Sequence, residues 1–280
     1  MIDITVEEIM TRDVVYTTIP GSRDDVLDLL KNKFVSGVPV VKEGKLTGIV
    51  TRTNLLENPE EEQTALIMAR NPITAAPYEG IEVAANRLIQ HNIRRLPVIE
   101  NNELIGIITV SDIIGTIANM DIKEPAGDYI ENHIVSVWEQ TPLPLVGKIM
   151  ELAGVKAVPV LDAENNLVGI VSDKDLIHAS SIVDTVEKSD MSAGSDEDAW
   201  TWDSMRDTMS LYYSVSRIEL PNVPVKDVMR DRNMTIMSTT PVSECARKMR
   251  RGKMEYLPVV KPNQKLKGLI KDRDLLKAIA

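Results

Sequence analysis

The sequence predicts an α+β protein made of four copies of one strand–helix–strand–strand–helix unit. The leading observation is a motif that occurs four times, in which a Pro-Val step is followed nine or ten residues later by a glycine. The four copies also share the apolar residues around these anchors, and near-equal spacings of this kind identify an internal repeat. The four motifs occupy residues 38–56, 96–114, 158–177 and 257–276.

Each motif predicts a β-hairpin that leads into a short helix. In the first copy, a β-branched segment starts at Pro39, a polar turn covers residues 42–44, and a second β-branched segment begins at Gly48. Two short apolar segments around a polar turn with Gly or Asn are typical of a hairpin. Proline lacks an N–H group and therefore fits the start or the edge of a strand. The Leu or Ile pairs that end each motif predict the closing helix.

The unit extends upstream of the hairpin. About 23 residues before each motif proline, a hydroxyl-bearing residue follows an apolar one and predicts the first strand. Apolar residues with helical spacing lie between that strand and the hairpin, for example in residues 23–33 and 243–253. A unit of about 50 residues buries too little surface to be stable alone, so two units should pack together. The four hydroxyl positions are Tyr16, Thr74, Ser136 and Thr235.

Composition narrows the function. Hydrophobic residues make up 43% and charged residues 26% of the 280 residues, as in ordinary soluble domains. The net charge of −10 disfavours nucleic-acid and membrane-surface binding, which need a basic face. Cys245 is the single cysteine, which excludes an internal disulfide, and no apolar run reaches the roughly 18 residues of a membrane span. Because the N-terminus also lacks the pattern of a signal peptide, we expect a cytoplasmic protein.

The fourfold Pro-Val and Gly-x-x-[Thr/Ser]-x-x-Asp pattern resembles the CBS domain, and two such units together resemble a Bateman module. The resemblance covers most of the chain. It implies one module at residues 1–122, with repeats 1 and 2, and a second at residues 123–280, with repeats 3 and 4. In repeat number the chain is similar to the gamma subunit of the AMP-activated kinase.

Repeat 4 is preceded by an insertion at about residues 178–224, because its proline follows that of repeat 3 by an unusually long interval. The first part of the insertion, residues 189–198, is small, polar and acidic and predicts a loop. Residues 199–213 predict an amphipathic helix that either packs on its own module or contacts another protein. The apolar face of this helix would consist of Trp202, Met205, Met209 and Tyr212.

A hydroxyl side chain follows the second hairpin strand in repeats 1, 2 and 3, and an acid comes three residues after that position in repeats 2, 3 and 4. Free N–H groups at a helix start favour an anion, and a carboxylate can accept hydrogen bonds from both hydroxyls of a ribose. In the CBS domains that the sequence resembles, this is the ribose–phosphate motif of an adenosine nucleotide site. The same pattern is also a capping box, which stabilises a helix end without a ligand, and both interpretations stay open. The candidate residues by repeat are Thr51 and Asn54, Thr109 and Asp112, Ser172 and Asp175, and Lys271 and Asp274.

Repeats 2 and 3 carry both the hydroxyl and the carboxylate, whereas repeats 1 and 4 depart from the pattern. In repeat 1 the amide of Asn54 replaces the carboxylate, which predicts weaker ribose binding or an empty site. In repeat 4 Lys271 replaces the hydroxyl, and its ammonium group could still reach a phosphate.

The resemblance further implies that an adenine ring lies between the first strand and the segment before the motif proline. Glycine or alanine there leaves room for a ring, and Arg or Tyr would stack on it or use its backbone. The pairs Arg94-Arg95 and Arg250-Arg251 are either solvated helix ends or partners for phosphate. The wall candidates are Tyr16, Thr74, Ser136 and Thr235 on the first strands, and Gly37, Arg95, Ala157 and Tyr256 before the prolines.

We find no signature of an enzyme in the sequence. The three histidines are far apart, and we expect no catalytic residue, no metal ligand and no catalytic cofactor. The chain is therefore expected to be a non-catalytic regulatory sensor that binds AMP, ADP or ATP in CBS clefts. One alternative is that the same clefts bind S-adenosylmethionine or methylthioadenosine, and another is an interaction module with vestigial clefts. A protein partner or a homodimer through the CBS modules would transmit the signal.

Overall fold

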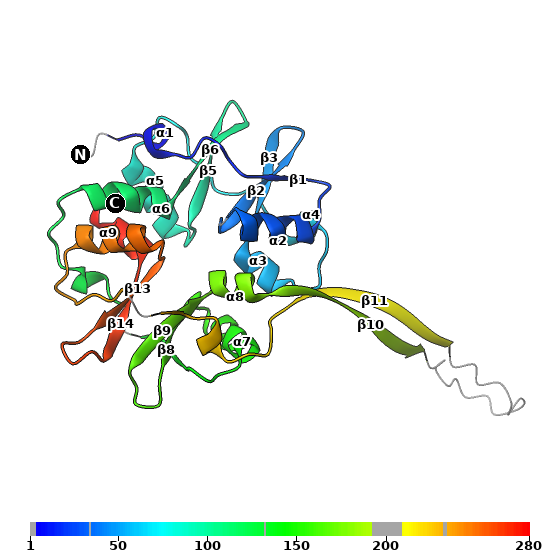
Figure 1. Ribbon diagram of the computed structural model, residues 1–280. Coiled ribbons are helices and arrows are strands. Elements are labelled where there is room, and N and C mark those ends of the chain that lie inside the picture. Colours follow the sequence, from blue (N-terminus) through cyan, green and yellow to red (C-terminus); the bar gives the residue numbers. More distant parts are fainter. Residues whose placement is uncertain (1–3, 34, 132, 192–208, 232–233) are drawn as a thin grey trace, which may run out of the picture.

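The four predicted units are present in the computed structural model of the chain, which describes residues 4–33, 35–131, 133–191, 209–231 and 234–280. Figure 1 shows the units arranged around a ring. Repeat 1 consists of α1 (Val6–Ile9), β1 (Thr17–Thr18), α2 (Arg23–Asn32), β2 (Gly37–Lys42), β3 (Lys45–Thr51) and α3 (Arg52–Glu57). Repeat 2 consists of α4 (Thr64–Ile67), β4 (Ala69–Arg70), α5 (Ile81–Gln90), β5 (Arg95–Glu100), β6 (Glu103–Thr109) and α6 (Val110–Asn119).

Repeats 3 and 4 follow the same order, and the α+β fold class is thereby confirmed. Repeat 3 consists of η1 (Ala126–Tyr129), β7 (Val137–Trp138), α7 (Leu143–Ala153), β8 (Ala157–Leu161), β9 (Leu167–Ser172) and α8 (Asp173–Ala179). Repeat 4 consists of η2 (Val225–Asp227), β12 (Arg230–Asp231), α9 (Val242–Gly252), β13 (Tyr256–Val260), β14 (Leu266–Lys271), α10 (Asp272–Leu275) and η3 (Leu276–Ala278).

The hairpins share one register, which explains the spacing of the motif. The motif proline always pairs with the residue that follows the motif glycine, as in Pro39 with Ile49 and Pro97 with Ile107. In all four hairpins the register then shifts at a bulge directly after the valine that follows the motif proline. The first strand of each unit runs parallel to the first hairpin strand, but in repeats 2 and 4 it consists of an isolated bridge. The equal register places the ends of all four hairpins in equivalent positions.

Within a pair of repeats, the segment before each first strand crosses to the neighbouring repeat. Thr11 of repeat 1 pairs with Ile107 of repeat 2, and Arg70 of repeat 2 pairs with Gly48 of repeat 1. Repeats 3 and 4 exchange segments in the same way, through β12 with β9 and Glu131 with Leu269. The motif glycine allows this approach, because a Cβ at Gly48 would lie 2.9 Å from the carbonyl oxygen of Ala69. Repeats 1 and 2 therefore pack as one unit, and repeats 3 and 4 as another.

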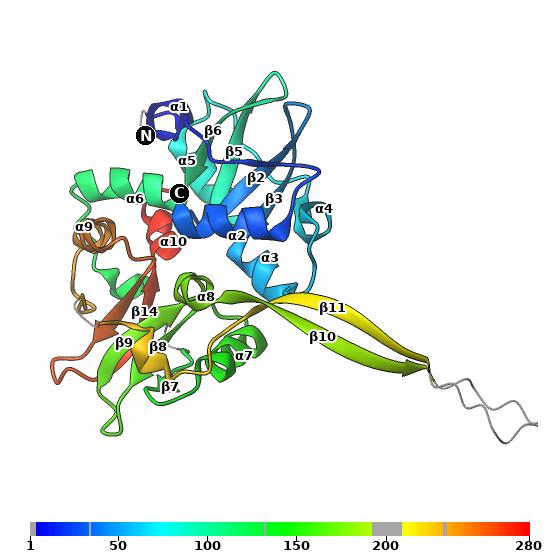
Figure 2. The same cartoon turned by 45° about the vertical axis from the view of Figure 1, so that its right-hand side comes forward.

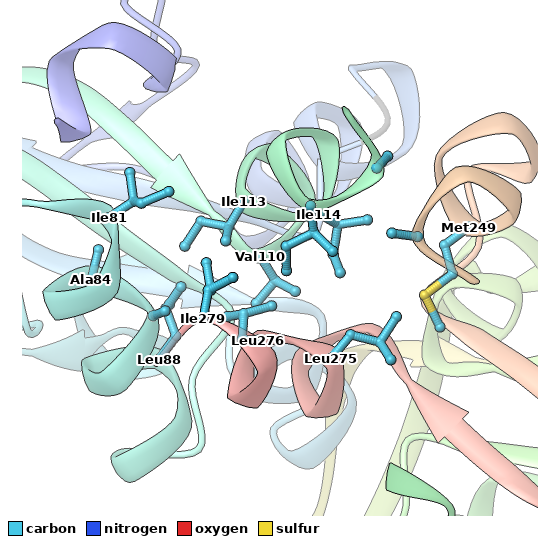
Figure 3. Close-up of a cluster of buried hydrophobic side chains, with 14 of the residues drawn as sticks. Ile81, Ala84, Leu88, Val110, Ile113, Ile114, Met249, Leu275, Leu276 and Ile279 are labelled. Atoms are coloured by element: carbon cyan, nitrogen blue, oxygen red, sulfur yellow. The ribbon is translucent and has the colours of Figure 1, made fainter. Parts of the chain in front are cut away.

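The core shows which repeats of the two pairs face each other. One large cluster of buried side chains combines repeats 2 and 4, where α6, α5, α9 and the last helices meet (Figure 3). Ile113 and Ile117 of α6 belong to it, together with Cys245 and Leu275 of repeat 4. Repeats 1 and 3 instead have separate clusters, although Ile177 of α8 reaches the cluster of repeat 1. The order around the ring is thus repeat 1, 2, 4 and 3.

The insertion before repeat 4 forms a two-stranded antiparallel arm, β10 (Ser181–Met191) with β11 (Met209–Glu219). The arm projects from the ring in both views (Figures 1 and 2). The predicted helix over residues 199–213 is wrong where it can be compared, because Met209 and Tyr212 lie in β11. Trp202 and Met205 lie outside the described residues. Apolar or aromatic residues stand at 209, 211, 213 and 215 and serines at 210, 214 and 216; with Tyr212 as the exception, this period of two fits a strand better than a helix.

The predicted boundary between residues 122 and 123 falls in the connection from α6 to η1. No helix of the described residues has the length and apolar character that are needed to cross a bilayer.

Candidate functional site

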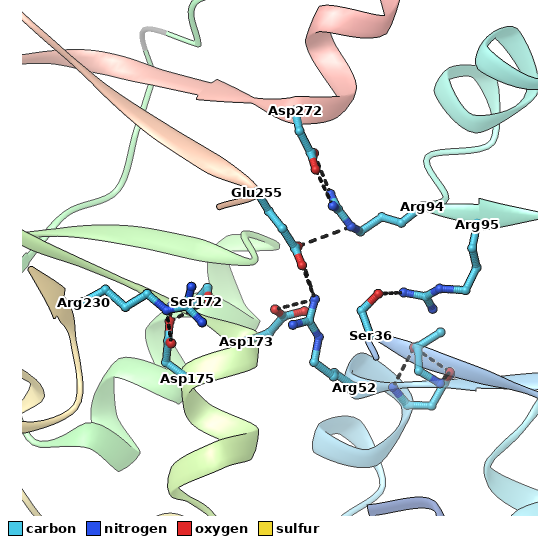
Figure 4. A network of polar contacts seen from close by, with 12 residues as sticks. Ser36, Arg52, Arg94, Arg95, Ser172, Asp173, Asp175, Arg230, Glu255 and Asp272 are labelled. Carbon is cyan, nitrogen blue, oxygen red and sulfur yellow. Dashed lines mark hydrogen bonds and ion pairs between the residues drawn. The ribbon is translucent and has the colours of Figure 1, made fainter. Parts of the chain in front are cut away.

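The four hairpin ends meet at the centre of the ring. In every repeat, the residue after the motif hydroxyl position donates its backbone N–H to the carbonyl of the residue three before the motif proline, over 2.9 to 3.5 Å. These two positions therefore lie side by side in each repeat, and Figure 4 shows several of their side chains converging. The pairs are Arg52 with Ser36, Val110 with Arg94, Asp173 with Lys156, and Asp272 with Glu255.

Repeat 2 carries the complete predicted motif, and its geometry is that of a capping box. The backbone N–H and the hydroxyl of Thr109 both donate to Oδ2 of Asp112, over 2.8 and 2.7 Å. The N–H of Asp112 donates back to the Thr109 hydroxyl over 3.4 Å. The other carboxylate oxygen, Oδ1, has no partner among the described residues. Burial raises the pKa of Asp112, while its bonds to Thr109 oppose that rise. Capping therefore occupies only one of the two oxygens that a ribose could use.

A cavity of about 930 Å³ adjoins this motif. Its walls join Thr109 and Asp112 of repeat 2 to the first-strand segment and the segment before the proline of repeat 1, including Val15 and Gly37. The ribose motif and the predicted ring walls thus come from different repeats of one pair, because the first segments cross over. The lining is strongly basic in a protein of net charge −10. Its basic residues are Lys33, Arg52, Arg94, Arg95, Lys174, Arg230, Arg250 and Lys253, and its acids are Asp13, Asp112, Glu255 and Asp272.

A second cavity, of about 380 Å³, adjoins the motif of repeat 1. It joins Thr51 and Asn54 to Ile73 and Ile93 of repeat 2, which is the reciprocal arrangement. The side-chain oxygen of Asn54 accepts from the Thr51 N–H at 2.9 Å and from its hydroxyl at 2.7 Å. The uncharged amide of Asn54 therefore caps α3 in the same geometry in which the carboxylate of Asp112 caps α6.

The cleft at the repeat 3 motif is closed by a side chain of the protein itself. The Ser172 N–H and hydroxyl donate to one oxygen of Asp175, over 2.8 and 2.6 Å. The other oxygen pairs with Nε of Arg230 at 2.8 Å. The adjoining cavity, bordered by Met254 and Tyr256, measures only about 20 Å³ and has no room for a nucleoside.

Repeat 4 also engages its candidate residues internally. The Lys271 ammonium group lies 2.5 Å from Oε2 of Glu131, a residue of the segment that crosses over from repeat 3. Asp274 lies 3.2 Å from the Lys277 ammonium group. Lys271 makes no side-chain cap of α10, unlike the hydroxyls of the other repeats.

The wall candidates predicted on the first strands lie one residue before those strands or bridges, and they do not line the cavities of about 930 and 380 Å³. Tyr16 is 52% exposed, and the preceding Val15 lines the larger cavity instead. Thr74 likewise borders a shallow outer hollow, while Ile73 lines the smaller cavity. The alternation of a strand accounts for this difference, since successive side chains point to opposite faces. Ser136 is exposed, and the carbonyl of Thr235 accepts from Lys248 at 3.3 Å.

The wall candidates before the prolines are all inside the molecule. Gly37 lies against Arg95, and a Cβ at Gly37 would overlap the Arg95 guanidinium group, which donates to Ser36. Burial, with repulsion from the neighbouring arginines, lowers the pKa of Arg95 to about 9. Ala157 and Tyr256 are buried together in a small cluster between repeats 3 and 4.

A network of ion pairs, which sequence reasoning missed, links the two pairs of repeats across the centre (Figure 4). Arg94 binds Asp272 with both terminal nitrogens, over 2.8 and 2.5 Å. Arg52 donates to both oxygens of Glu255, over 2.9 and 3.2 Å, and lies 3.3 Å from Asp173. Burial alone would raise the pKa of Glu255, but Arg94 and Arg52 outweigh it and lower the pKa to about 2. The sequence did hold a signal for this network, because its residues stand at equivalent positions of the four repeats, with arginines in repeats 1 and 2 and acids in repeats 3 and 4.

The remaining candidates for chemistry offer no reactive centre in the described part of the chain. Burial raises the pKa of the Cys245 thiol to about 12, so this residue is a core side chain at neutral pH. Among the described residues, no group of three His, Cys, Asp or Glu side chains is placed to hold a metal ion.

The chain is similar in sequence to known proteins over much of its length. The uncharacterized protein MJ1225 of Methanocaldococcus jannaschii is 25% identical over 191 residues, which make up 61% of this chain and 68% of MJ1225. The CBS domain-containing protein YhcV of Bacillus subtilis is 28% identical over 134 residues, or 46% of this chain and 94% of YhcV.

Solved structures agree with the fold over nearly the whole chain. The crystal structure of MJ1225, a protein considered an archaeal homolog of g-AMPK, has a TM-score of 0.77 at 23% identity and covers 99% of this chain and 100% of MJ1225. An uncharacterized conserved protein from Pyrococcus horikoshii has a TM-score of 0.66 at 28% identity, with coverage of 99% and 100%. The family model for the CBS domain matches residues 6–61, 64–119, 126–182 and 225–280. These four matches fill most of the sequence, and the chain accordingly belongs to the CBS domain family.

Proposed function

We propose that this chain is a regulatory rather than a catalytic protein, and that it binds an adenosine nucleotide in the cavity of about 930 Å³ beside repeat 2. The observation that carries the proposal is the position of Asp112. Its Oδ2 caps α6, its Oδ1 stays unpaired among the described residues, and Asp112 is one of the residues that line the cavity. A carboxylate in this state can accept the hydroxyls of a ribose without giving up its structural role.

The size and charge of the cavity support a nucleotide. Ligand cavities commonly measure about 300–1,000 Å³, and this one lies at the upper end of that range. Val14 and Val15 supply apolar surface for a ring, whereas the Arg95 guanidinium group takes up the space beside Gly37. The basic lining favours phosphate groups, so AMP, ADP and ATP are the ligands that we expect.

We propose fewer than four working sites. The cavity at repeat 1 is smaller, and Asn54 there offers no charge to a ribose. In repeat 3 the Asp175 carboxylate forms an ion pair with Arg230, and in repeat 4 Lys271 forms an ion pair with Glu131, so neither is available to a ligand. Repeat 2 is therefore the main site, and repeat 1 a weaker one.

We propose residues 1–122 and 123–280 as the two Bateman modules, since all the crossing segments pair within these ranges. The motif residues of both proposed sites belong to the first module, while the second module contributes further lining residues, among them Glu255 and Asp272 at the larger cavity. A ligand would then act by population shift: it favours one arrangement of the modules and so alters contacts with a protein partner or a second copy of the chain. A cytoplasmic location fits the free thiol of Cys245.

Isothermal titration of the purified chain with adenosine, AMP, ADP, ATP, S-adenosylmethionine and methylthioadenosine tests the proposal. We expect adenosine to bind and the affinity to change with the number of phosphates. At about 100 times the dissociation constant, the bound nucleotide should raise the free energy of unfolding by about 2.7 kcal/mol. Preferred binding of the two sulfur compounds would favour the alternative ligands. If no compound binds, the clefts are vestigial and the proposal is wrong.

A further inference from the structure

Charge is divided between the two modules at equivalent positions of the hairpin ends. The positions are the one after the motif hydroxyl and the one three residues before the motif proline. In the first module they include Arg52 and Arg94, and Arg95 directly follows Arg94. In the second module, the equivalent positions carry mainly acids, namely Asp173, Glu255 and Asp272, with Lys156 as the exception. The ring brings these opposite charges into contact, so the modules are joined at the centre by ion pairs rather than by apolar side chains (Figure 4).

The carboxylates take the place on the arginines that a phosphate would take. Arg94 holds Asp272 through two parallel hydrogen bonds from its two terminal nitrogens, whereas Arg52 reaches both oxygens of Glu255 with one nitrogen, Nη2. The planar guanidinium fork binds carboxylate and phosphate in the same geometry. Both arginines and both acids line the cavity that also contains Asp112. A ligand phosphate in that cavity therefore competes with module 2 for the same donors.

The two acids differ in their exposure and in the geometry of their contacts. The side chain of Asp272 is 5% exposed, whereas that of Glu255 is 22% exposed. Glu255 also divides its oxygens between Arg52 and Arg94, and its contact with Nε of Arg94 is long, at 3.3 Å. In addition, the buried Nε of Arg52 has no hydrogen-bond partner among the described residues. Glu255 therefore leaves one N–H donor of this guanidinium group without an acceptor. Glu255 is the acid that an incoming anion can displace, and Asp272 keeps Arg94 in position.

We propose that Glu255 is a specificity-determining residue, which occupies Arg52 as an internal counterpart of phosphate and is displaced by the phosphate of a bound nucleotide. This inference rests on the proposed nucleotide site. It means that an uncharged nucleoside binds with the central network intact. A nucleotide binds only by breaking the ion pair of Glu255 with Arg52, which joins repeat 4 to repeat 1. Phosphate recognition and the contact between the modules are thereby coupled.

Titrations with adenosine and AMP on three proteins test this inference: the wild type, Glu255→Gln and Asp13→Asn. Asp13 is the matched control, because its acid lines the same cavity but makes no ion pair with a described arginine. In Glu255→Gln we expect AMP to bind at least tenfold more tightly and adenosine to bind as in the wild type, since the competing charge is gone. In Asp13→Asn, which removes a cavity acid without freeing an arginine, we expect a gain in AMP affinity of no more than about twofold, well below that of Glu255→Gln.

If the ratio of AMP affinity to adenosine affinity in Glu255→Gln equals that of the wild type, the inference is wrong. Binding of adenosine in the same experiment would still support the proposed site. An equal gain in Asp13→Asn would also overturn it, because the effect would then be general electrostatics. Failure of both ligands to bind all three proteins refutes the proposed function itself. If Glu255→Gln does not fold, Glu255→Asp can replace it, because the shorter side chain keeps the charge but holds it farther from Arg52. In Glu255→Asp we expect a smaller gain in AMP affinity and no change in adenosine affinity.

Discussion

Asp112 and Asn54 occupy the same position in two repeats, and each caps its helix with a single side-chain oxygen. Because Asn54 does so without charge, Asp112→Asn should keep the cap of α6 and remove only the negative charge. We expect the affinity for adenosine to fall by about 10- to 100-fold, as one charge-assisted hydrogen bond contributes about 1.5–3 kcal/mol. The melting temperature should stay close to that of the wild type. Calorimetric titration and a thermal melt measure both quantities.

Two further variants separate ligand binding from capping. Asn54→Asp should add adenosine binding in the cavity of about 380 Å³ and raise the measured stoichiometry. Asp175→Asn is the matched control, because Arg230 closes the cleft of repeat 3, and we expect it to leave adenosine affinity unchanged. If Asp112→Asn binds adenosine as well as the wild type, the motif serves capping alone.

The pKa of Asp112 gives binding a dependence on pH. Burial raises this pKa above the ordinary value, so the carboxylate takes up a proton at a higher pH than an exposed aspartate. A protonated Asp112 no longer accepts both ribose hydroxyls, and we expect adenosine affinity to fall on acidification at a higher pH than it would with an exposed aspartate. The effect on folding has the opposite sign: a raised carboxyl pKa costs stability above it, and protonation relieves that cost. Titrations at several pH values measure the loss, and a similar slope in Asp112→Asn would contradict its assignment to this residue.

At the scale of elements, Arg23 fixes the base of the projecting arm to repeat 1. Its side chain is 1% exposed at the start of α2, and it donates to the carbonyls of Pro59 and Ser216 and to the Ser216 hydroxyl, over 2.8 to 2.9 Å. Arg23→Ala removes these three hydrogen bonds to half-buried acceptors, and we expect it to lower the free energy of unfolding by about 3 kcal/mol. Urea denaturation measures this change.

The control for this prediction is Arg12→Ala, which removes an exposed arginine with a single long ion pair and should change stability by less than about 0.5 kcal/mol. Arg23→Lys keeps the charge but not the planar fork, so an intermediate loss is expected. Equal stability of Arg23→Ala and Arg12→Ala would show that the arm does not depend on this anchor.

The elements also show how far the sequence could predict the site. The hairpins and the pair Thr109 and Asp112 were predictable, because the motif lies within some 20 residues and its geometry is local. Glu255 was not, since its contact with Arg52 depends on which repeats face each other across the ring. The arm was mispredicted as a helix because its pairing partner, β10, lies in a separate segment that the spacing of residues 199–213 does not reveal.

At the scale of the whole molecule, the ring is unequal on its two sides. Repeats 2 and 4 share one continuous core, whereas between repeats 1 and 3 the buried clusters are separate. A cavity of about 510 Å³ lies there, bordered by Leu56 of α3, Met150 of α7, Leu176 of α8 and Ile218 of the arm. The shared core is therefore the main apolar link between the modules, and the central ion pairs are the polar link. The side with the cavity has less packing to oppose a movement of the modules.

This inequality predicts how the molecule unfolds. Ile113 is fully buried in the shared core, and Ile113→Ala should cost about 2–5 kcal/mol in unfolding free energy. Because the core belongs to both modules, we expect the fluorescence of Trp138 in repeat 3 to change at the same lowered temperature as the circular dichroism of the whole chain. Trp200 and Trp202 would be replaced by Phe so that Trp138 is the single reporter. Val146→Ala, in the separate core of repeat 3, is the control. It should lower the transition temperature of the Trp138 fluorescence at least as much as that of the circular dichroism. If Ile113→Ala leaves the Trp138 transition at its wild-type temperature, the modules unfold independently, and the shared core does not couple them.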